Sequence, residues 1–399
     1  MITRRTEQLH QIINYVRRTA GCSRQDICRE LELSASITSP LVRSLLDKQV
    51  LDEVGAETSE GGRPRVKLEL NPKYAVGIGI HVPMHGMKGG LVDARGNCIA
   101  ERCPEVSTKN CIEDTLNDIY TMIAYFQAEV GSRKLCGVGI SVSGVIGNNG
   151  TVTREFSDGE PWINVPLADA VEERCGIRPI VLNDVHAATL AEYRLGGWGG
   201  IRNLVLLHVG DGIAAGYIIN GSLYRGARGN AGQIGHNMVD ETGPLCYCGN
   251  RGCLESLASP QALARDSIDA IKRGVRTRIL EEAGAPEAIR FKHIRNAAAG
   301  GDPFAANLLD TVGRTIGQTV AKMINTFEPE MFLLGGLLTD PESDIVANIR
   351  RSAELRMLPA LRQNVAIDCG RLKGEAATLG AGVAVLDTFF SDVNQWMDV

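Results

Sequence analysis

The spacing of hydrophobic residues changes once along the chain, at Asn71-Pro72, and this change determines the domain organisation. Before it, apolar residues recur mainly at helical spacing, and two short strand-like segments follow. From Tyr74 onward, short apolar runs typical of strands alternate with helical patterns. At roughly 100–200 residues per domain, 399 residues accommodate two or three domains. We therefore expect an N-terminal domain over residues 1–70 and an α/β part over residues 71–399, joined by a hinge.

The first seventy residues predict three helices followed by a hairpin. Ser23 and Asp26 form a capping-box pattern at the start of the second helix. A third helical pattern runs over residues 37–46, and two strand-like segments follow at residues 50–54 and 66–70. The first helix is indicated by an apolar stripe at positions i, i+3, i+4 and i+7: Leu9, Ile12, Ile13 and Val16. This order predicts a winged helix-turn-helix.

In that fold, residues near the start of the third helix contact base edges in the major groove. Arg63 and Arg65 flank Pro64 at the expected wing tip, where guanidinium groups suit phosphates or a minor groove. Pro40 leaves two possibilities, a helix that begins after a Ser39 cap or a distorted helix. The alternative is a small helical protein-interaction domain. The helix candidates for DNA contact are Ser34, Ser36, Thr38, Ser39 and Arg43.

The α/β part contains two sets of predicted strands, separated by Gly196-Gly197-Trp198-Gly199-Gly200. We expect two similar lobes, at about residues 71–196 and 197–399, with a cleft between them. The strands are predicted at residues 75–80, 89–92, 135–142, 180–182, 204–209, 214–219 and 331–334. Helices are predicted at residues 111–130, 166–175, 187–195, 260–273 and 302–327.

A metal site is indicated by His236, Cys246, Cys248 and Cys253, spaced H-x9-C-x-C-x4-C. One imidazole and three thiolates make a closed tetrahedral set, which is typical of structural zinc. The intervening glycines allow a tight loop around a small ion. Buried free cysteines are the alternative, but three cysteines within eight positions favour Zn²⁺ as a structural cofactor.

The motifs of residues 74–390 resemble the two-lobed, actin-like (ribonuclease H-like) ATPase domain of the ROK family of repressors, open reading frames and sugar kinases. A winged helix in front matches the repressor branch of that family. The resemblance is carried by Gly229-Asn230-Ala231-Gly232-Gln233-Ile234-Gly235-His236, by the stretch from Cys246 to Glu255, by Asn183-Asp184 before an Ala-rich helix, and by Leu334-Gly335-Gly336.

The resemblance implies a sugar-binding site made of five residues. Asn183 matches a hydroxyl-binding amide, and Asp184 matches the carboxylate that acts as base in the kinases. Taken alone, Asp184 is also explained as a helix cap. His236 matches a residue that touches sugar and completes the zinc site, and Glu255 matches a sugar-contacting carboxylate. Gln233 departs from the family, in which many relatives have Glu, so the ligand is expected to differ.

The phosphate-binding motifs of the related kinases are altered here. Where those kinases have Asp-x-Gly-Gly-Thr, this chain has His81-Val82-Pro83-Met84-His85, in which Pro83 lacks an N–H. Gly210-Asp211-Gly212 replaces Gly-Thr-Gly and would place a carboxylate against a triphosphate. Leu337 follows Gly335-Gly336 where a further glycine is usual. We expect that the chain is not an enzyme.

The sequence therefore predicts a transcriptional repressor of carbohydrate genes that binds operator DNA as a homodimer or tetramer and responds to a sugar or phosphosugar. Eleven cysteines, no apolar signal segment and no apolar run that could cross a bilayer indicate a cytoplasmic protein without membrane insertion. Two alternatives remain: a sugar kinase with an accessory DNA-binding domain, and a regulator controlled by a protein partner.

Overall fold

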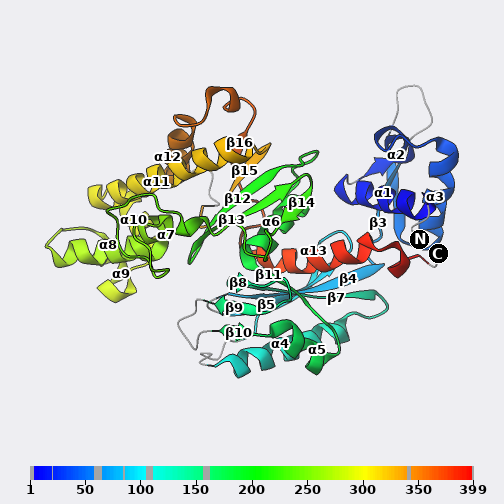
Figure 1. Cartoon of the computed structure of the whole chain (residues 1–399), viewed down its shortest axis with the longest axis horizontal. Coiled ribbons are helices and arrows are strands. Elements are labelled where there is room, and N and C mark those ends of the chain that lie inside the picture. Colours follow the sequence, from blue (N-terminus) through cyan, green and yellow to red (C-terminus); the bar gives the residue numbers. More distant parts are fainter. Residues whose placement is uncertain are drawn as a thin grey trace. The chain divides into compact units, whose positions relative to one another are not determined.

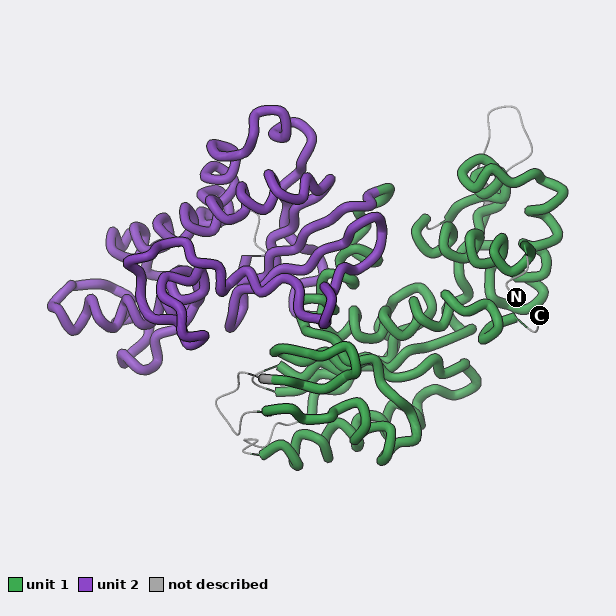
Figure 2. The backbone as a smooth tube through the Cα atoms, in the orientation of Figure 1, with its two compact units in different colours: residues 1–200, 375–399 green, residues 201–374 purple. Residues whose placement is uncertain are grey.

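The computed structural model describes residues 4–19, 21–57, 65–83, 86–104, 111–155, 162–338 and 343–397. The chain divides into two compact units (Figure 2). Unit 1 comprises residues 1–200 and 375–399, and unit 2 comprises residues 201–374. Among the described helices, none combines the length and the apolar character that a membrane span requires.

The N-terminal module of unit 1 covers residues 4–70 and contains three helices and three strands (Figure 1). The elements are α1 (Arg4–Arg18), β1 (Cys22–Ser23), α2 (Arg24–Glu30), α3 (Ala35–Asp47), β2 (Leu51–Glu57) and β3 (Arg65–Leu70). The strands form an antiparallel sheet in the order β1-β3-β2, so β1 adds a short strand to the predicted hairpin. The predicted stripe of α1 faces the core, because Leu9, Ile12, Ile13 and Val16 are all buried.

The capping box at Ser23 is confirmed. The backbone N–H of Asp26 donates to Ser23 Oγ at 3.3 Å, and the N–H of Ser23 donates to Asp26 Oδ2 at 2.9 Å. These bonds satisfy two N–H groups at the open end of α2. Pro40 lies inside α3, which starts at Ala35. Of the two possibilities that Pro40 left open, a helix that begins after a Ser39 cap is therefore excluded.

The rest of unit 1 is a five-stranded sheet in the order β11-β7-β4-β5-β6, with helices on both faces (Figure 1). β4, β7 and β11 are parallel, and β5 and β6 are antiparallel to their neighbours. The elements are β4 (Ala75–Val82), β5 (Lys88–Asp93), β6 (Cys98–Arg102), α4 (Ile112–Glu129), β7 (Lys134–Val142), α5 (Leu167–Cys175), β11 (Ile180–Asn183), α6 (Asp184–Leu195) and α13 (Ala376–Ser391). A small sheet of β8 (Gly144–Ile146), β9 (Val152–Glu155) and β10 (Ile163–Val165) adjoins it.

The C-terminal helix α13 lies on one face of this sheet in very close contact. A side chain at Gly77 would meet the carbonyl oxygen of Gly382 at 2.8 Å, and side chains at Gly79 and Gly139 would collide with the backbone of α13. The glycines therefore let helix and strand backbones touch. The expectation that residues 197–399 form one lobe is corrected here, because residues 375–399 belong to unit 1.

Unit 2 repeats the strand arrangement of unit 1. Its sheet has the order β14-β13-β12-β15-β16, with an antiparallel meander of three strands and two further parallel strands. Unit 1 has the same pattern in the order β6-β5-β4-β7-β11. The predicted similarity of the lobes is thus present in their topology. The strands are β12 (Leu204–Val209), β13 (Ile213–Ile219), β14 (Ser222–Tyr224), β15 (Met331–Gly336) and β16 (Ala366–Cys369).

The helices of unit 2 pack around an apolar core that includes Leu207, Ile316 and Phe332. The long helix α11 lies beside α12, and Gly317 of α11 makes room for Ser352 of α12. The helices are α7 (Leu254–Ala258), α8 (Pro260–Lys272), α9 (Ile279–Ala283), α10 (Phe291–Ala299), α11 (Pro303–Phe327) and α12 (Asp344–Glu354). Short 3-10 turns lie at Ile234–His236, Pro286–Ala288, Pro359–Leu361, Lys373–Glu375 and, in unit 1, Val393–Gln395.

Candidate functional site

The predicted ligand residues of unit 1 lie at the carboxyl ends of parallel strands. Asn183 ends β11 and pairs in register with Val142 at the end of β7. Ser143, the next residue after β7, therefore lies beside Asp184, and its hydroxyl donates to Asp184 Oδ2 at 2.7 Å. Ligands of open α/β sheets bind outside this edge, so the local fold favours a binding role.

Asn183 is the N-cap of α6. Its Oδ1 accepts from the N–H groups of Val185 at 2.9 Å and His186 at 3.3 Å, and its Nδ2 donates to the carbonyl of Gly144 at 2.9 Å. Asn183 thus provides the N-terminal cap of α6 that the sequence analysis considered for Asp184. Asp184 is only half buried. Its carboxylate, oriented by Ser143, is the group of this pair that a ligand hydroxyl reaches more readily.

In unit 2, the four predicted metal ligands come together. The ligand atoms of His236, Cys246, Cys248 and Cys253 all lie within 4.8 Å of one another. The Nδ1 atom of His236 is 3.7 Å from Cys246 Sγ, so this nitrogen faces the cysteines. Such a set of one imidazole and three thiols fits a tetrahedral cation.

The loop that carries the cysteines depends on glycine. Gly252 has φ +64°, and any side chain there would collide with the carbonyl oxygen of Asp240. Gly249, between Cys248 and Cys253, has φ +94°. Both conformations are ones that residues with a Cβ seldom adopt. The glycines predicted to allow a tight loop therefore do so at these two positions.

Protonation of the cysteines differs across the cluster. Burial raises the pKa of Cys253 to about 12, whereas hydrogen bonding to the backbone N–H of Asn250 lowers the pKa of Cys248. A cation that binds here must displace the thiol protons, since the thiolate is the ligand. Binding is then coupled to the folding of the loop.

Glu255 is tied to the same loop. Cys253 is the N-cap of α7, and Glu255 lies in the first turn of that helix. Its Oε2 accepts from the backbone N–H of Ile213 at 2.7 Å. A side chain at Gly212 would lie 2.7 Å from Glu255 Oε2, and one at Gly235 would lie 3.1 Å from it. The two glycines therefore make room for the buried carboxylate.

Tyr247 and Ser143 are site residues that the sequence alone did not indicate. Tyr247 Oη lies 3.1 Å from His236 Nε2, and the two rings meet edge to face with their centroids 5.1 Å apart. Burial and the neighbouring Glu255 raise the pKa of Tyr247. Its position between two metal-ligating cysteines could have pointed to it. Gln233 lies half buried immediately before the turn that ends with His236.

The predicted ligand residues thus form two groups. Asn183 and Asp184 belong to unit 1, whereas Gln233, His236 and Glu255 belong to unit 2. Each group contains a carboxylate whose position is fixed by a hydrogen bond inside its own unit. Carboxylates placed in this way suit adjacent hydroxyl groups of a polyol or sugar.

The altered phosphate motifs of unit 2 lie together at one edge of its sheet. Val209 pairs with Gly336, and the N–H of Leu337 donates to the carbonyl of Val209 at 2.7 Å. Asp211 is exposed, and the Leu337 side chain is 45% exposed. In unit 1, His81 Nδ1 lies 3.1 Å from Ser141 Oγ. Met84 and His85 lie outside the described residues.

The predicted DNA-contacting residues are mostly on the surface. Ser34, Ser36, Ser39 and Arg43 are exposed on or just before α3. The prediction that Thr38 contacts DNA is wrong, because its side chain is fully buried and accepts a hydrogen bond from Cys28 Sγ at 3.3 Å. Thr38 therefore holds α3 against α2 and does not face a ligand.

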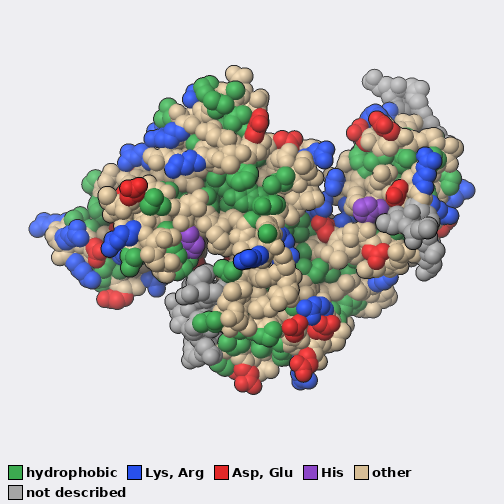
Figure 3. All heavy atoms as spheres, in the orientation of Figure 1, with side chains coloured by type: hydrophobic (Ala, Val, Ile, Leu, Met, Phe, Trp, Pro, Cys, Tyr) green, Lys and Arg blue, Asp and Glu red, His purple; other side chains and the backbone are tan. Residues whose placement is uncertain are grey.

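On the wing, Arg65 is exposed at the start of β3, and Arg63 lies outside the described residues. Lys and Arg side chains are spread over the surface of the N-terminal module, with a few acidic side chains among them (Figure 3).

Comparison with known proteins gives one consistent result. A model of the family described as ROK matches residues 77–388. A putative xylose repressor from Caldicellulosiruptor sp. (strain Rt8B.4) is 29% identical over 367 residues, which is 91% of each chain. The DNA-binding transcriptional dual regulator NagC of Escherichia coli (strain K12) is 28% identical over 352 residues, covering 86% of this chain and 84% of NagC.

A solved structure is similar along nearly the entire chain. It is the crystal structure of a ROK family transcriptional regulator described as a homologue of the E. coli MLC protein. The two share 26% sequence identity and a TM-score of 0.79, over 97% of each chain. The likeness therefore extends through the N-terminal module as well as the two α/β sheets.

Proposed function

Because the chain belongs to the ROK family, we propose that it is a DNA-binding transcriptional repressor of carbohydrate genes, controlled by a sugar or phosphosugar. The observation that carries this proposal is the likeness to a ROK transcriptional regulator over 97% of both chains. Relatives named as xylose repressor and as NagC support the same conclusion. The protein acts in the cytoplasm.

The N-terminal module is a winged helix-turn-helix. Its support is the order of three helices and an antiparallel sheet, with α3 presenting an exposed row of polar residues. The proposed base-contacting residues are Ser34, Ser36, Ser39 and Arg43. Arg65, at the start of β3, and Arg63 are proposed to contact DNA as well. Two recognition helices require two copies of the chain, so the protein binds an inverted repeat as a homodimer or tetramer.

The effector is a sugar or phosphosugar bound by Asn183, Asp184, Gln233, His236 and Glu255. The support is chemical, because each unit contributes a carboxylate whose position is fixed by a hydrogen bond inside that unit. Gln233 supplies both a donor and an acceptor, whereas a carboxylate would supply acceptors alone. A ligand lacking the matching hydroxyls leaves polar groups unpaired and binds weakly.

Zn²⁺ is the cation that His236, Cys246, Cys248 and Cys253 fit best, because three soft thiolates and one imidazole select it over Mg²⁺ or Ca²⁺. When bound, zinc supplies structural cross-linking and leaves no open position for a reaction. These residues then hold the loop that precedes Glu255 and fix the ring of His236.

The test begins with selection of duplexes from a random-sequence library by the purified full chain. We expect enrichment of inverted repeats whose half-sites are one helical turn, or a multiple of it, apart. Fluorescence anisotropy on the selected duplex is then repeated with D-xylose, N-acetyl-D-glucosamine, D-glucose and their 6- or 5-phosphates. Failure to enrich any sequence overturns the proposal, and binding that no sugar changes redirects it to control by a protein partner.

The kinase alternative is tested separately with the same sugars and ATP. The altered loops at His81, Asp211 and Leu337 leave few groups suited to a triphosphate. We expect no sugar-dependent ADP formation above the level of a protein-free reaction. Turnover of any sugar in the panel would favour the kinase.

A further inference from the structure

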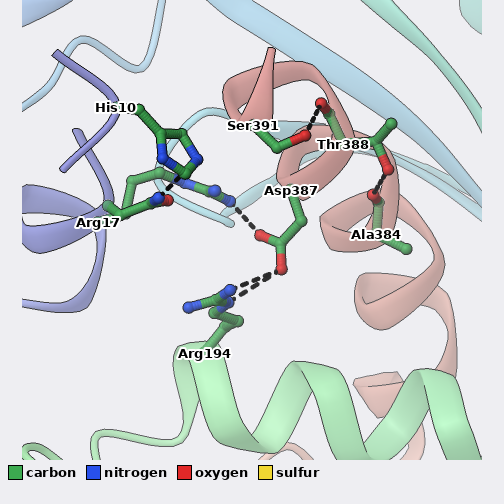
Figure 4. A network of polar contacts seen from close by, with 8 residues as sticks. His10, Arg17, Arg194, Ala384, Asp387, Thr388 and Ser391 are labelled. Atoms are coloured by element: carbon green, nitrogen blue, oxygen red, sulfur yellow. Dashed lines mark hydrogen bonds and ion pairs between the residues drawn. The ribbon is translucent and has the colours of Figure 1, made fainter. Parts of the chain in front are cut away.

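Three charged side chains from distant parts of the sequence meet within unit 1 (Figure 4). Asp387 of α13 pairs with Arg17 in the last turn of α1. Its Oδ2 also accepts from Arg194 Nε at 3.0 Å and Arg194 Nη2 at 2.8 Å. We call these residues the arginine–aspartate triad. The triad joins the N-terminal module to α6 and α13.

The triad is secluded from water, since the side chains of Arg17, Asp387 and Arg194 are 8%, 21% and 15% exposed. Burial would raise the pKa of Asp387, but the two guanidinium groups hold it below its usual range. The Arg17 guanidinium also lies over the ring of Phe390, 5.0 Å from its centroid. Removing one partner would leave a buried charge uncompensated, which is energetically costly.

Ion pairs and a partly open hollow with a mainly apolar lining surround the triad. Arg95 Nε donates to the carbonyl of Leu70 at 2.6 Å, and Arg95 Nη1 lies 2.8 Å from Glu69 Oε2. A cavity of about 110 Å³ lies among Arg17, Arg95, Arg194 and neighbouring apolar side chains. Protein interiors are normally close-packed. A junction with free space and ionic contacts can rearrange with little loss of apolar packing.

Helix α6 connects this junction to the proposed ligand site. Asn183 caps its start, Asp184 is its first residue, and Arg194 lies in its last turn. Ten residues at 1.5 Å each place Asp184 and Arg194 about 15 Å apart along the axis. The helix is buried along most of its length, and a side chain at Gly380 of α13 would collide with the Ala187 carbonyl. We therefore expect α6 to move as a rigid body.

We infer that the arginine–aspartate triad transmits occupancy of the ligand site to the N-terminal module. A sugar held by Asp184 displaces α6 together with the closely packed α13, so that Arg194 and Asp387 shift relative to Arg17. The inference rests on the proposed function and adds the route of its regulation. The ligand acts only through its different affinity for the two arrangements of the triad.

The experiment compares the wild type with Arg194→Met in the full-length chain. Arg194→Met leaves the pair of Arg17 and Asp387 in place, so the module stays attached. Arg178→Met is the matched control, because Arg178 forms exposed ion pairs with Asp169 and Glu172 on the surface of unit 1. Sugar affinity is measured by calorimetry with D-xylose, N-acetyl-D-glucosamine, D-glucose and their phosphates. Operator affinity is measured by anisotropy with and without each sugar.

In the wild type and in Arg178→Met, we expect the bound sugar to change operator affinity by about 5–150-fold, the usual range of allosteric coupling. In Arg194→Met, we expect sugar affinity within about threefold of the wild type but a sugar-dependent change in operator affinity below about threefold. This combination separates lost coupling from lost folding. If Arg194→Met does not fold, Arg194→Lys replaces it, because lysine keeps the positive charge but cannot donate two parallel hydrogen bonds to Asp387. The same limits on sugar affinity and on the sugar-dependent change in operator affinity then apply.

A full sugar response in Arg194→Met overturns the inference while leaving the proposed function intact. A wild type that binds the operator but responds to none of the three sugars or their phosphates has a different meaning. That result contradicts the proposed effector, and with it the inference.

Discussion

The hydroxyl of Tyr247 lies 3.1 Å from His236 Nε2, on the side of the ring opposite the nitrogen that faces the cysteines. If Nδ1 binds the metal, Nε2 carries the proton and donates it to Tyr247 Oη. A partner of this kind fixes the orientation of a metal-ligating imidazole and raises its basicity. The arrangement makes Tyr247 part of the candidate metal site, although it is not one of the four candidate ligands.

We predict that Tyr247→Phe lowers zinc affinity by about 10–100-fold, the usual effect of losing such a partner. The ring and its edge-to-face contact with His236 are kept, so the change isolates the hydroxyl. Competition with a chromogenic chelator measures the affinity. Tyr224→Phe, at an exposed position in β14, is the control and should leave it unchanged. Equal affinities in all three proteins would contradict the role given to the hydroxyl.

Cys246→Ser should abolish stoichiometric zinc in the purified protein and weaken operator binding. Cys246 is buried beside His236, and serine is a poor ligand for a thiolate site. Metal content is measured by inductively coupled plasma mass spectrometry, and operator binding by anisotropy. Cys98→Ser is the matched control, because Cys98 is exposed on β6. A zinc-free variant with normal operator affinity would show that the loop does not influence the DNA-binding state.

Arg43→Met should weaken binding to the selected operator by about 1–3 kcal/mol if its guanidinium reads a base edge. Arg43 is exposed on α3, one turn beyond the exposed Ser39. Anisotropy on operator and scrambled duplexes separates lost specificity from a general loss of affinity. Thr38→Val provides a contrast, because Thr38 is buried against Cys28. We expect it to leave base preference unchanged. Unaltered operator affinity in Arg43→Met would remove this residue from the interface.

The capping box makes the stability of the N-terminal module dependent on pH. Hydrogen bonds from the Ser23 backbone and side chain lower the pKa of Asp26. A lowered folded-state pKa contributes stability above the unfolded value, and that contribution is lost as the pH falls through the folded value. Asp26→Asn should therefore destabilise the module at pH 7, with a difference that shrinks below about pH 4.

Ser23→Ala should cost about 1 kcal/mol at neutral pH by removing the same cap. Hydrogen exchange of the α2 amides at several pH values measures both effects locally. The double variant should cost less than the sum of the two single changes, since both remove one reciprocal pair. If the two changes destabilise the module additively, or if the effect of Asp26→Asn does not depend on pH, the reciprocal capping box of Ser23 and Asp26 is contradicted.

Local patterns predicted much of this structure. The stripe of α1 and the cap at Ser23 depend on residues within one turn or two, so helical periodicity was sufficient. The clustering of the metal ligands was predictable for the same reason, because Cys246, Cys248 and Cys253 share one tight loop. Glycines at the turns of that loop strengthened the prediction.

Contacts between distant segments were not predictable in this way. Asp387 meets Arg17 and Arg194 only because α13 returns to unit 1, and no local pattern specifies that return. The error at Thr38 has a related cause, since a hydroxyl in an amphipathic helix gives no sign of a thiol partner on the preceding helix. Topology supplies one general signal that could have found Ser143, namely that parallel strands end at the same edge.

The return of α13 also bears on how the protein is made. Its backbone fills the glycine-lined face of β4 and β7, so that face stays uncovered until residues 375–399 leave the ribosome. Unit 2, encoded between the two pieces of unit 1, is free to fold first. A prematurely terminated product would carry a complete module for reading DNA but no Asp387 to hold Arg17. Such a fragment would also lack the route by which the proposed effector controls the N-terminal module.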